Sequence, residues 1–204
     1  KCANCYLGDM LNNPKFPNVD MIKFEEAISR LPKRCDIRFI GAEPTMNENL
    51  FDLIKIVRRY KHKPSLLTNG LKLFKEQYVI DLKKSGLNFL GLSMNGGLDD
   101  EVYKRFDNGK YAKAKMKALE NCIKHKIVPH INVIVDPTNI HILKPLLDYI
   151  IMLCKKYNRT PETVSLKLPT LKKVGEGKKE LPKLNLPKLK KVGEDKKELP
   201  KLNL

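Results

Sequence analysis

Two kinds of hydrophobic pattern alternate along most of the chain. Short apolar runs rich in Ile, Val, Leu and Phe are typical of buried strands. Longer segments repeat their apolar residues every three or four positions, which places one apolar stripe along a helix. The predicted strands are residues 37–40, 65–68, 89–93, 131–135 and 164–168, and the predicted helices carry stripes that begin at Met21, Leu50, Phe74, Met116 and Leu143.

This alternation of strands and helices predicts an α/β fold. About five repeats of the pattern imply parallel strands joined by right-handed crossovers. Gly86 follows the third predicted helix, at the position of a C-terminal cap. A chain of 204 residues with 42% hydrophobic residues predicts one main domain, yet it is short for an eight-unit βα barrel. The pattern alone leaves open whether the sheet is doubly wound or part of a barrel.

The last part of the chain follows a different pattern. Residues 168–185 are repeated as residues 186–203 with two differences, and two copies are too few for a solenoid. Prolines interrupt any helix there, and lysine-rich sequence leaves little apolar area to offset the entropy of ordering. We therefore predict a flexible, low-complexity tail rich in Lys, Leu and Pro over residues 168–204.

The formal net charge of +17 bears on partners and location. A basic field attracts nucleic-acid backbones and anionic membranes. The lysines are spread along the whole chain and no nucleic-acid-binding motif occurs, which favours a solvated surface. No apolar stretch is long enough for a membrane helix, and no signal-peptide pattern is present. We expect a cytoplasmic protein with no membrane partner.

Cys2 and Cys5 form a CxxC pair that is followed by Tyr6. The chain holds five cysteines, an odd number that makes a poor disulfide framework, so we expect reduced thiols. A lone CxxC pair serves as half of a zinc site, as a redox dithiol, or as two thiolate ligands of an iron–sulfur cluster. The pair alone does not decide among these three uses.

Polar residues and glycines gather where the predicted strands end. Ligands bind at the C-terminal ends of strands in parallel βα folds, so these positions are candidates for a binding site. Each one alone is also typical of an ordinary turn or of a strand side chain satisfied by a neighbour. The candidates are Gly41, Ala42, Glu43 and Pro44 after the first strand, Thr68 and Asn69 after the second, Ser93 and Asn95 after the third, and Asn132 in the fourth.

Taken in order, these motifs resemble the radical S-adenosylmethionine (SAM) superfamily. The order is a cysteine pair with an aromatic residue, then GAEPT, TNG, SMNG and an INVIV strand. The resemblance is closest to the branch that contains the molybdopterin-precursor cyclase and peptide-modifying enzymes. It implies that residues 1–167 form a partial TIM-like barrel of the (βα)5 to (βα)6 type, with the repeat tail outside it.

The resemblance also implies two cofactors, a 4Fe–4S cluster and SAM. Cys2 and Cys5 match the second and third cysteines of the family's CxxxCxxC cluster motif, and Tyr6 matches the aromatic residue that follows it. The segment GAEP matches the family's GGEP motif, which binds the SAM amino group. The implied SAM-binding residues are Tyr6, Gly41, Ala42, Glu43, Pro44, Thr68, Asn69, Ser93, Asn95, Asn132 and Arg105, the last near a carboxylate-binding position of some members.

One departure from the family pattern concerns the first cysteine of the cluster motif. It would lie upstream of Lys1, and so would the first barrel strand. We therefore expect an N-terminally truncated barrel whose missing ligand precedes this chain. Cys35 is a poor substitute because it lies at the opposite, N-terminal end of its predicted strand.

The function implied by the resemblance is reductive cleavage of SAM at the cluster. The resulting 5′-deoxyadenosyl radical removes hydrogen from an unidentified substrate, which is a small molecule, a peptide or an RNA. An electron donor for the cluster is the second expected partner. Two alternatives stay open: a non-catalytic fragment with a basic nucleic-acid-binding surface, and a thiol redox module that uses Cys2 and Cys5.

Overall fold

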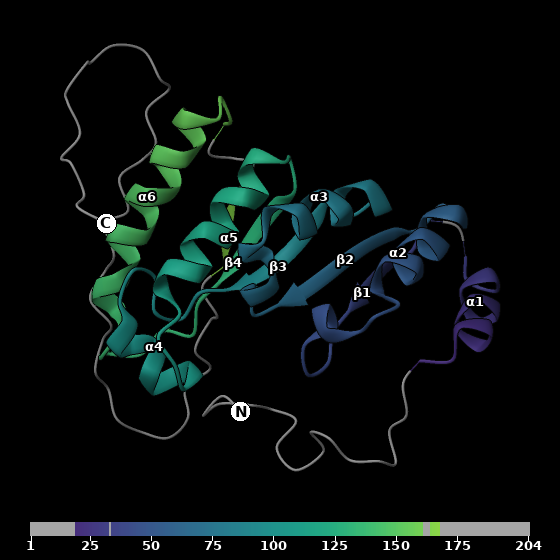
Figure 1. The fold of residues 1–204 in the computed structure, drawn as a ribbon, viewed down its shortest axis with the longest axis horizontal. Coiled ribbons are helices and arrows are strands. Elements are labelled where there is room, and N and C mark those ends of the chain that lie inside the picture. The colour runs from purple at the N-terminus through teal and green to yellow at the C-terminus, as the bar shows by residue number, and fades with distance from the viewer. Residues whose placement is uncertain (1–18, 33, 161–163, 168–204) are drawn as a thin grey trace. The chain divides into compact units, whose positions relative to one another are not determined.

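The computed structural model describes residues 19–32, 34–160 and 164–167 (Figure 1). All of these residues belong to one compact unit, Lys1–Thr170. Cys2, Cys5, Tyr6 and the repeat tail lie outside the described residues. The predictions for them therefore remain predictions.

The strands form a five-stranded parallel sheet with the order β1-β2-β3-β4-β5. A doubly wound sheet reverses its strand order at a switch point, whereas a βα barrel keeps neighbouring strands in chain order. The sequential order therefore confirms the prediction of a partial TIM-like barrel. The strands are β1 (Asp36–Phe39), β2 (Lys63–Thr68), β3 (Phe89–Ser93), β4 (Val128–Asn132) and β5 (Ser165–Lys167).

Helices follow the strands as predicted, with one addition. The additional helix is α4, whose eight residues include only a few apolar positions and which begins after the side-chain cap of Asp99. Gly86 ends α3 with a φ of +105°, as expected for a glycine cap. No helix among the described residues is long and apolar enough to cross a membrane. The α-helices are α1 (Met21–Ser29), α2 (Leu50–Arg59), α3 (Glu76–Ser85), α4 (Asp100–Asp107), α5 (Ala112–Lys124) and α6 (Leu143–Lys156); the short 3-10 helices are η2 (Pro44–Met46), η3 (Leu71–Phe74) and η4 (Ile140–Ile142).

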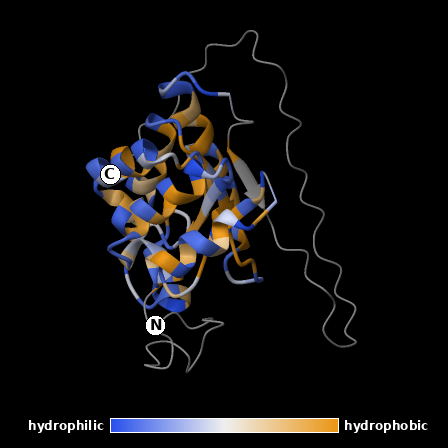
Figure 2. Cartoon of the chain, turned by 90° about the vertical axis from the view of Figure 1, so that its right-hand side faces the viewer, coloured by the Kyte–Doolittle hydropathy of each residue, from blue (hydrophilic) through white to orange (hydrophobic). Residues whose placement is uncertain are grey.

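The two faces of the sheet differ in their surroundings. One face is buried against the helices, where each buried leucine or isoleucine stabilises the fold by about 2 kcal/mol. Along the helices, hydrophobic and hydrophilic positions alternate, as expected for elements with one covered side (Figure 2). The other face carries the alternate strand residues and is open enough to hold a ligand. The strand side chains of the buried face include Leu66, Leu90, Leu92 and Ile131, which are at most 1% exposed.

The fourth strand lies earlier than the sequence predicts. The hydrophobic run 131–135 suggested a strand there, but β4 covers Val128–Asn132. Just beyond the end of β4, the Ile134 N–H donates to Asn95 Oδ1 (3.0 Å), and the Ile134 carbonyl accepts from Asn139 Nδ2 (2.7 Å). These side-chain hydrogen bonds replace the strand pairing that the apolar run predicted.

Glu120 on α5 joins the ends of two neighbouring helices. Its carboxylate accepts hydrogen bonds from Lys156 Nζ (2.8 Å), from the Tyr157 hydroxyl (2.7 Å) and from Lys117 Nζ (2.9 Å). Burial alone would raise the pKa of Glu120, but the hydrogen bonds outweigh it and lower the pKa to about 2. The ionised carboxylate is therefore the form that the fold favours.

The substitution Glu120→Gln is expected to weaken the acid sensitivity of the fold. A carboxyl whose pKa is lower in the folded chain stabilises the fold above its unfolded value of 4.5, and this contribution is lost as the pH falls toward 2. Because solvent screens such pairs, we expect a loss of about 1 kcal/mol at neutral pH. Urea unfolding across this pH range measures it, with Asp148→Asn in the exposed Lys144–Asp148 pair as control. An unchanged pH dependence would contradict this role of Glu120.

Candidate functional site

The C-terminal ends of β1 to β4 bring most of the predicted site residues to one edge of the sheet. The strands are parallel and in close register, with Thr68 beside Leu92 and Ser93 beside Asn132. The segment 41–44 follows β1, and Asn69 follows β2. Residues that are far apart in the sequence therefore meet at the edge where βα folds bind ligands.

Glu43 lies at the centre of a hydrogen-bond cluster on this edge. Its Oε1 accepts from the Thr45 hydroxyl (2.7 Å), the Thr45 N–H (3.2 Å) and the Thr68 hydroxyl (2.6 Å). Its Oε2 accepts from the N–H of Asn69 (2.7 Å). The carboxylate thereby ties the turn after β1 to the end of β2. Glu43 and Thr68, both predicted SAM-binding residues, hold each other in place.

Tyr78 of α3 supports this cluster from the helix layer. Its hydroxyl donates to the carbonyl of Thr45 (3.1 Å), and its ring lies 5.1 Å from that of Phe51. Burial raises the pKa of Tyr78 to about 12, and the nearby negative charge of Glu43 adds to this effect. The phenol thus stays protonated and keeps donating to the turn.

Gly41 and Ala42 form the exposed start of the same turn. Gly41 has a φ of +140°, a backbone conformation that residues other than glycine rarely adopt. Pro44 begins η2, where its fixed φ is compatible with a helical first turn and Glu43 caps the helix. The turn therefore presents its backbone at the strand edge in a conformation set by Gly41 and Glu43.

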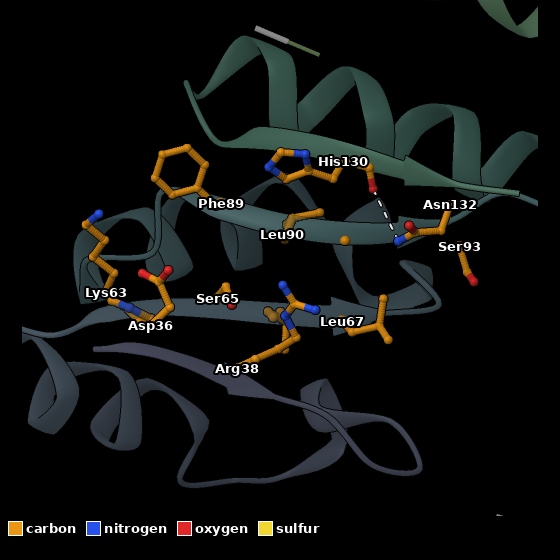
Figure 3. A pocket seen from close by; sticks show the side chains of 13 residues that line it. Asp36, Arg38, Lys63, Ser65, Leu67, Phe89, Leu90, Ser93, His130 and Asn132 are labelled. Carbon is orange, nitrogen blue, oxygen red and sulfur yellow. Dashed lines mark hydrogen bonds between the residues drawn. The ribbon is translucent and has the colours of Figure 1, made fainter. Parts of the chain in front are cut away.

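The open face of the sheet carries a hollow of about 490 Å³ (Figure 3). Ser93 and Asn132 lie side by side at one end of it, where β3 and β4 finish, and Arg38, Leu67 and Phe89 also line it. Cavities of this size hold small ligands or parts of larger ones. Of the predicted site residues within the described part of the chain, Ser93 and Asn132 are the two that line this hollow.

Gly91 on β3 lines the hollow and leaves room beside it. A Cβ at this position would lie 2.7 Å from Leu67 Cδ1 and 2.8 Å from Asn132 Nδ2, both far closer than normal contact. Glycine on β3 therefore allows the Asn132 amide to extend across its neighbouring strand. The Ser93 hydroxyl and the Asn132 amide thus line this end of the hollow together.

Asn95 and Asn69 are engaged by the protein itself. Asn95 Nδ2 donates to Asp107 (3.0 Å), its Oδ1 accepts from Ile134, and its side chain is buried. Asn69 Oδ1 accepts from the N–H of Leu71 (2.9 Å), which stabilises the turn after β2. Both residues therefore lie at the strand edge, but their side chains already form hydrogen bonds with other residues of the chain.

Arg105 lies apart from the hollow, on the exposed side of α4. Its guanidinium is 5.0 Å from the ring centre of Phe106. The side-chain hydrogen bond from Thr138 lowers the pKa of Asp136, and the charge of Arg105 contributes to the same shift. Since Asp136 follows β4, Arg105 faces the loops at the C-terminal edge of the sheet and not the sheet itself.

The hollow is also lined by Arg38, Phe89 and His130, which were not predicted as site residues from the sequence. Phe89 and His130 are stacked, with ring centres 6.3 Å apart. The alternation of side chains along β1 could have indicated Arg38. Because Arg38 lies between Ile37 and Phe39, its side chain points to the face of the sheet opposite the core. In a barrel, the side of a strand that faces away from the helix-covered core faces the barrel interior, so a charged residue there is a candidate site residue.

The cysteines within the described residues are Cys35, Cys122 and Cys154, and all three are free thiols. The described residues contain no group of three or more His, Cys, Asp or Glu side chains that could hold a metal ion. Cys35 precedes β1 and therefore lies at the N-terminal edge of the sheet, whereas Ser93 lies at the C-terminal edge. The Cys35 thiol lies 3.0 Å from the carbonyl of Pro32. Cys122 is buried, which raises the pKa of its thiol to about 12 and disfavours the thiolate. The prediction of Cys2 and Cys5 as ligands is therefore unaffected by the described part.

Comparison with known families agrees with this arrangement. The profile of the radical SAM superfamily matches residues 1–150. The chain therefore belongs to the radical SAM superfamily, whose enzymes use a 4Fe–4S cluster and SAM. The motif order, the barrel-like sheet and the family match point to the same class of protein.

Several curated relatives are similar to this chain. A 7,8-dihydro-6-hydroxymethylpterin dimethyltransferase of Methanocaldococcus jannaschii is 31% identical over 60% of this chain and 24% of its own length. A GTP 3′,8-cyclase of Clostridium perfringens is 26% identical over 88% of this chain and 54% of its own length. The chain thus spans about a quarter to half of these relatives.

Solved structures show the same fold. The structure described as native anSMEcpe with bound AdoMet aligns with a TM-score of 0.58 at 19% identity, covering 87% of this chain and 50% of its own. Streptococcus suis SuiB bound to its precursor peptide SuiA aligns with a TM-score of 0.56 at 20% identity, covering 78% and 34%. These likenesses support the fold.

Proposed function

We propose that this chain is the barrel part of a radical SAM enzyme that cleaves SAM reductively and removes a hydrogen atom from a substrate. The observation that carries the proposal is the meeting of GAEPT, TNG and Ser93 at one strand edge, next to a hollow of about 490 Å³. When bound, the cluster supplies the electron that splits SAM into methionine and a 5′-deoxyadenosyl radical. The protein supplies position, hydrogen bonds and exclusion of water.

Each part of the strand edge has a proposed role toward SAM. The backbone of the turn 41–44 accepts hydrogen bonds from the amino group, and Glu43 fixes the shape of that turn. Ser93 and Asn132 offer a hydroxyl and an amide to the ribose or the carboxylate. Cys2 and Cys5 would supply two of the three thiolates that hold the cluster, and Tyr6 is the aromatic residue that follows them in the family pattern.

The substrate is proposed to enter the hollow on the open face of the sheet. Related proteins are described as acting on a pterin or on GTP, and a structural neighbour is bound to a precursor peptide. The hollow is large enough for a small molecule or for one side chain of a peptide. Its lining of Arg38, Phe89 and His130 offers a positive charge and an aromatic surface to either kind of substrate.

Anaerobic reconstitution tests the proposed function. The protein at its full natural length, treated with iron and sulfide, is expected to develop the visible absorbance of an iron–sulfur cluster and to bind SAM in a calorimetric titration. A colourless protein that binds no SAM would overturn the proposal. A disulfide between Cys2 and Cys5 with a measurable potential that iron does not affect would instead favour the thiol redox alternative.

Ser93→Ala is expected to weaken SAM binding without altering the fold. The hydroxyl lines the hollow at the strand edge, and the loss of one hydrogen bond costs about 1 kcal/mol, or roughly a fivefold rise in Kd. Titration of the reconstituted protein with SAM measures the change. Ser29→Ala is the matched control, because that hydroxyl bonds only to the carbonyl of Glu26 on an exposed helix. Equal SAM affinity in both variants would remove Ser93 from the site.

A further inference from the structure

A buried lysine lies directly behind the strand edge of the proposed site. The Lys115 side chain is 1% exposed, and its Nζ donates to Asp107 Oδ2 (2.6 Å) and to the carbonyl of Ser93 (3.0 Å). The same ammonium lies 4.8 Å from the ring centre of Tyr103. Lys115 thus connects α5 and α4 to the last residue of β3.

The network continues from Asp107 to the end of β4. Asp107 Oδ1 accepts from Asn95 Nδ2 (3.0 Å), and Asn95 Oδ1 accepts from the N–H of Ile134 (3.0 Å). Asn139 closes the network, since its Nδ2 donates to the carbonyls of Asn95 (3.2 Å) and Ile134 (2.7 Å). One chain of hydrogen bonds therefore holds the backbone that follows both β3 and β4.

Stability alone does not explain this network. Lys115 is the fourth residue of α5, near the helix N-terminus, where the backbone dipole disfavours a cation. Buried ion pairs can often be replaced by apolar residues of similar volume without loss of stability, whereas removal of one partner is strongly destabilising. A buried pair at such a position therefore contributes defined geometry more than stability.

The geometry that the network defines is that of Ser93 and Asn132. These two residues are register partners at the ends of β3 and β4, and Met94 N–H donates to the carbonyl of Asn132 (2.9 Å) just beyond them. The network fixes the backbone on the far side of this pair, at Ser93 and Ile134. A shift there would move the hydroxyl and the amide that face the hollow.

We propose that Lys115 and Asp107 are positioning residues that hold Ser93 and Asn132 in place for SAM. This inference rests on the proposed function of the strand edge. Neither residue touches the hollow, so both act through the backbone of β3 and of the segment after β4. The role differs from simple packing because it requires the polar pair itself and not its volume.

The test separates SAM affinity from stability by means of two variants of the full-length, reconstituted protein. Lys115→Met leaves Asp107 buried without its cation, and we expect lower thermal stability together with about a tenfold or greater rise in the Kd for SAM. The double variant Lys115→Met/Asp107→Leu replaces the pair with apolar side chains. It is expected to regain stability but not SAM affinity. Lys144→Met, in an exposed pair, is the control and should change neither.

Hydrogen exchange without SAM gives a second readout. In the double variant the amides of Met94 and Ile134 are expected to exchange about tenfold faster, while those in β2 keep their rates. Recovery of SAM affinity together with stability in the double variant, or unchanged exchange at Met94 and Ile134, would overturn the inference. If the unmodified protein binds no SAM, the proposed function fails, and the exchange rates still decide whether the pair holds these strand ends.

Discussion

Glu43→Gln is expected to weaken SAM binding by about ten- to a hundredfold and to destabilise the fold by about 2 kcal/mol. The carboxylate accepts hydrogen bonds from four donors, on Thr45, Thr68 and Asn69. A glutamine keeps one oxygen, so its amide nitrogen must face either the Asn69 N–H or the two threonine hydroxyls. At least one donor then loses its acceptor, and the turn after β1 loses its link to β2.

The measurement compares Glu43→Gln with Glu48→Gln by urea unfolding and by SAM titration of the reconstituted protein. Glu48 is an exposed acid on the same loop, so its change matches the loss of charge without the loss of the cluster of hydrogen bonds. Glu48→Gln is expected to behave like the unmodified protein. A Glu43→Gln protein with normal stability and normal SAM affinity would show that the turn does not depend on this carboxylate.

The double variant Cys2→Ser/Cys5→Ser is expected to lose the iron–sulfur cluster completely. A 4Fe–4S cluster of this family needs three thiolates, and serine is a poor ligand for it. Iron and sulfide content after anaerobic reconstitution, with the visible absorbance, measures the loss. Both residues lie outside the described part of the chain, and the prediction rests on their match to the family motif.

Cys35→Ser serves as the control for the cysteine variants. Its thiol lies at the N-terminal edge of the sheet, away from the strand ends that form the proposed SAM site. The variant is therefore expected to assemble a full cluster. Loss of the cluster in Cys35→Ser, with retention in the double variant, would reverse the assignment of the ligands.

The fold could be predicted from hydrophobic spacing because the spacing is a local property. Five strands and five helices were predicted near their observed positions, and the sequential strand order agrees with the barrel that the motifs implied. The displaced strand β4 could not be predicted because its end depends on Asn95 and Asn139, which bond to Ile134 from elsewhere in the chain. Helix α4 was missed because it is short and polar on most sides.

The candidate site was predictable as a set of strand ends but not as a set of contacts. Motif order pointed to Glu43, Thr68, Ser93 and Asn132, and the parallel register brings these residues to one edge. The sequence does not reveal that Glu43 bonds to Thr68, or that Lys115 reaches the carbonyl of Ser93. Such contacts join residues separated by 22 or more positions, and no local pattern specifies them.

The relatives also bear on the alternatives to an enzyme. Family membership agrees with radical SAM chemistry, and so does the similarity of this chain to a pterin dimethyltransferase and to a GTP 3′,8-cyclase. The alternative of a non-catalytic fragment with a basic, nucleic-acid-binding surface gains no support from them. The excess of lysine is better explained as a solvated surface, since the lysines are spread along the whole chain.

The central claim is that this strand edge binds SAM for reductive cleavage, and product analysis tests it most directly. The full-length protein is reconstituted, reduced under anaerobic conditions and incubated with SAM. We predict that 5′-deoxyadenosine and methionine form in equal amounts, and that Ser93→Ala and Glu43→Gln form less. Absence of 5′-deoxyadenosine from a protein that carries a complete, reduced cluster would contradict the claim.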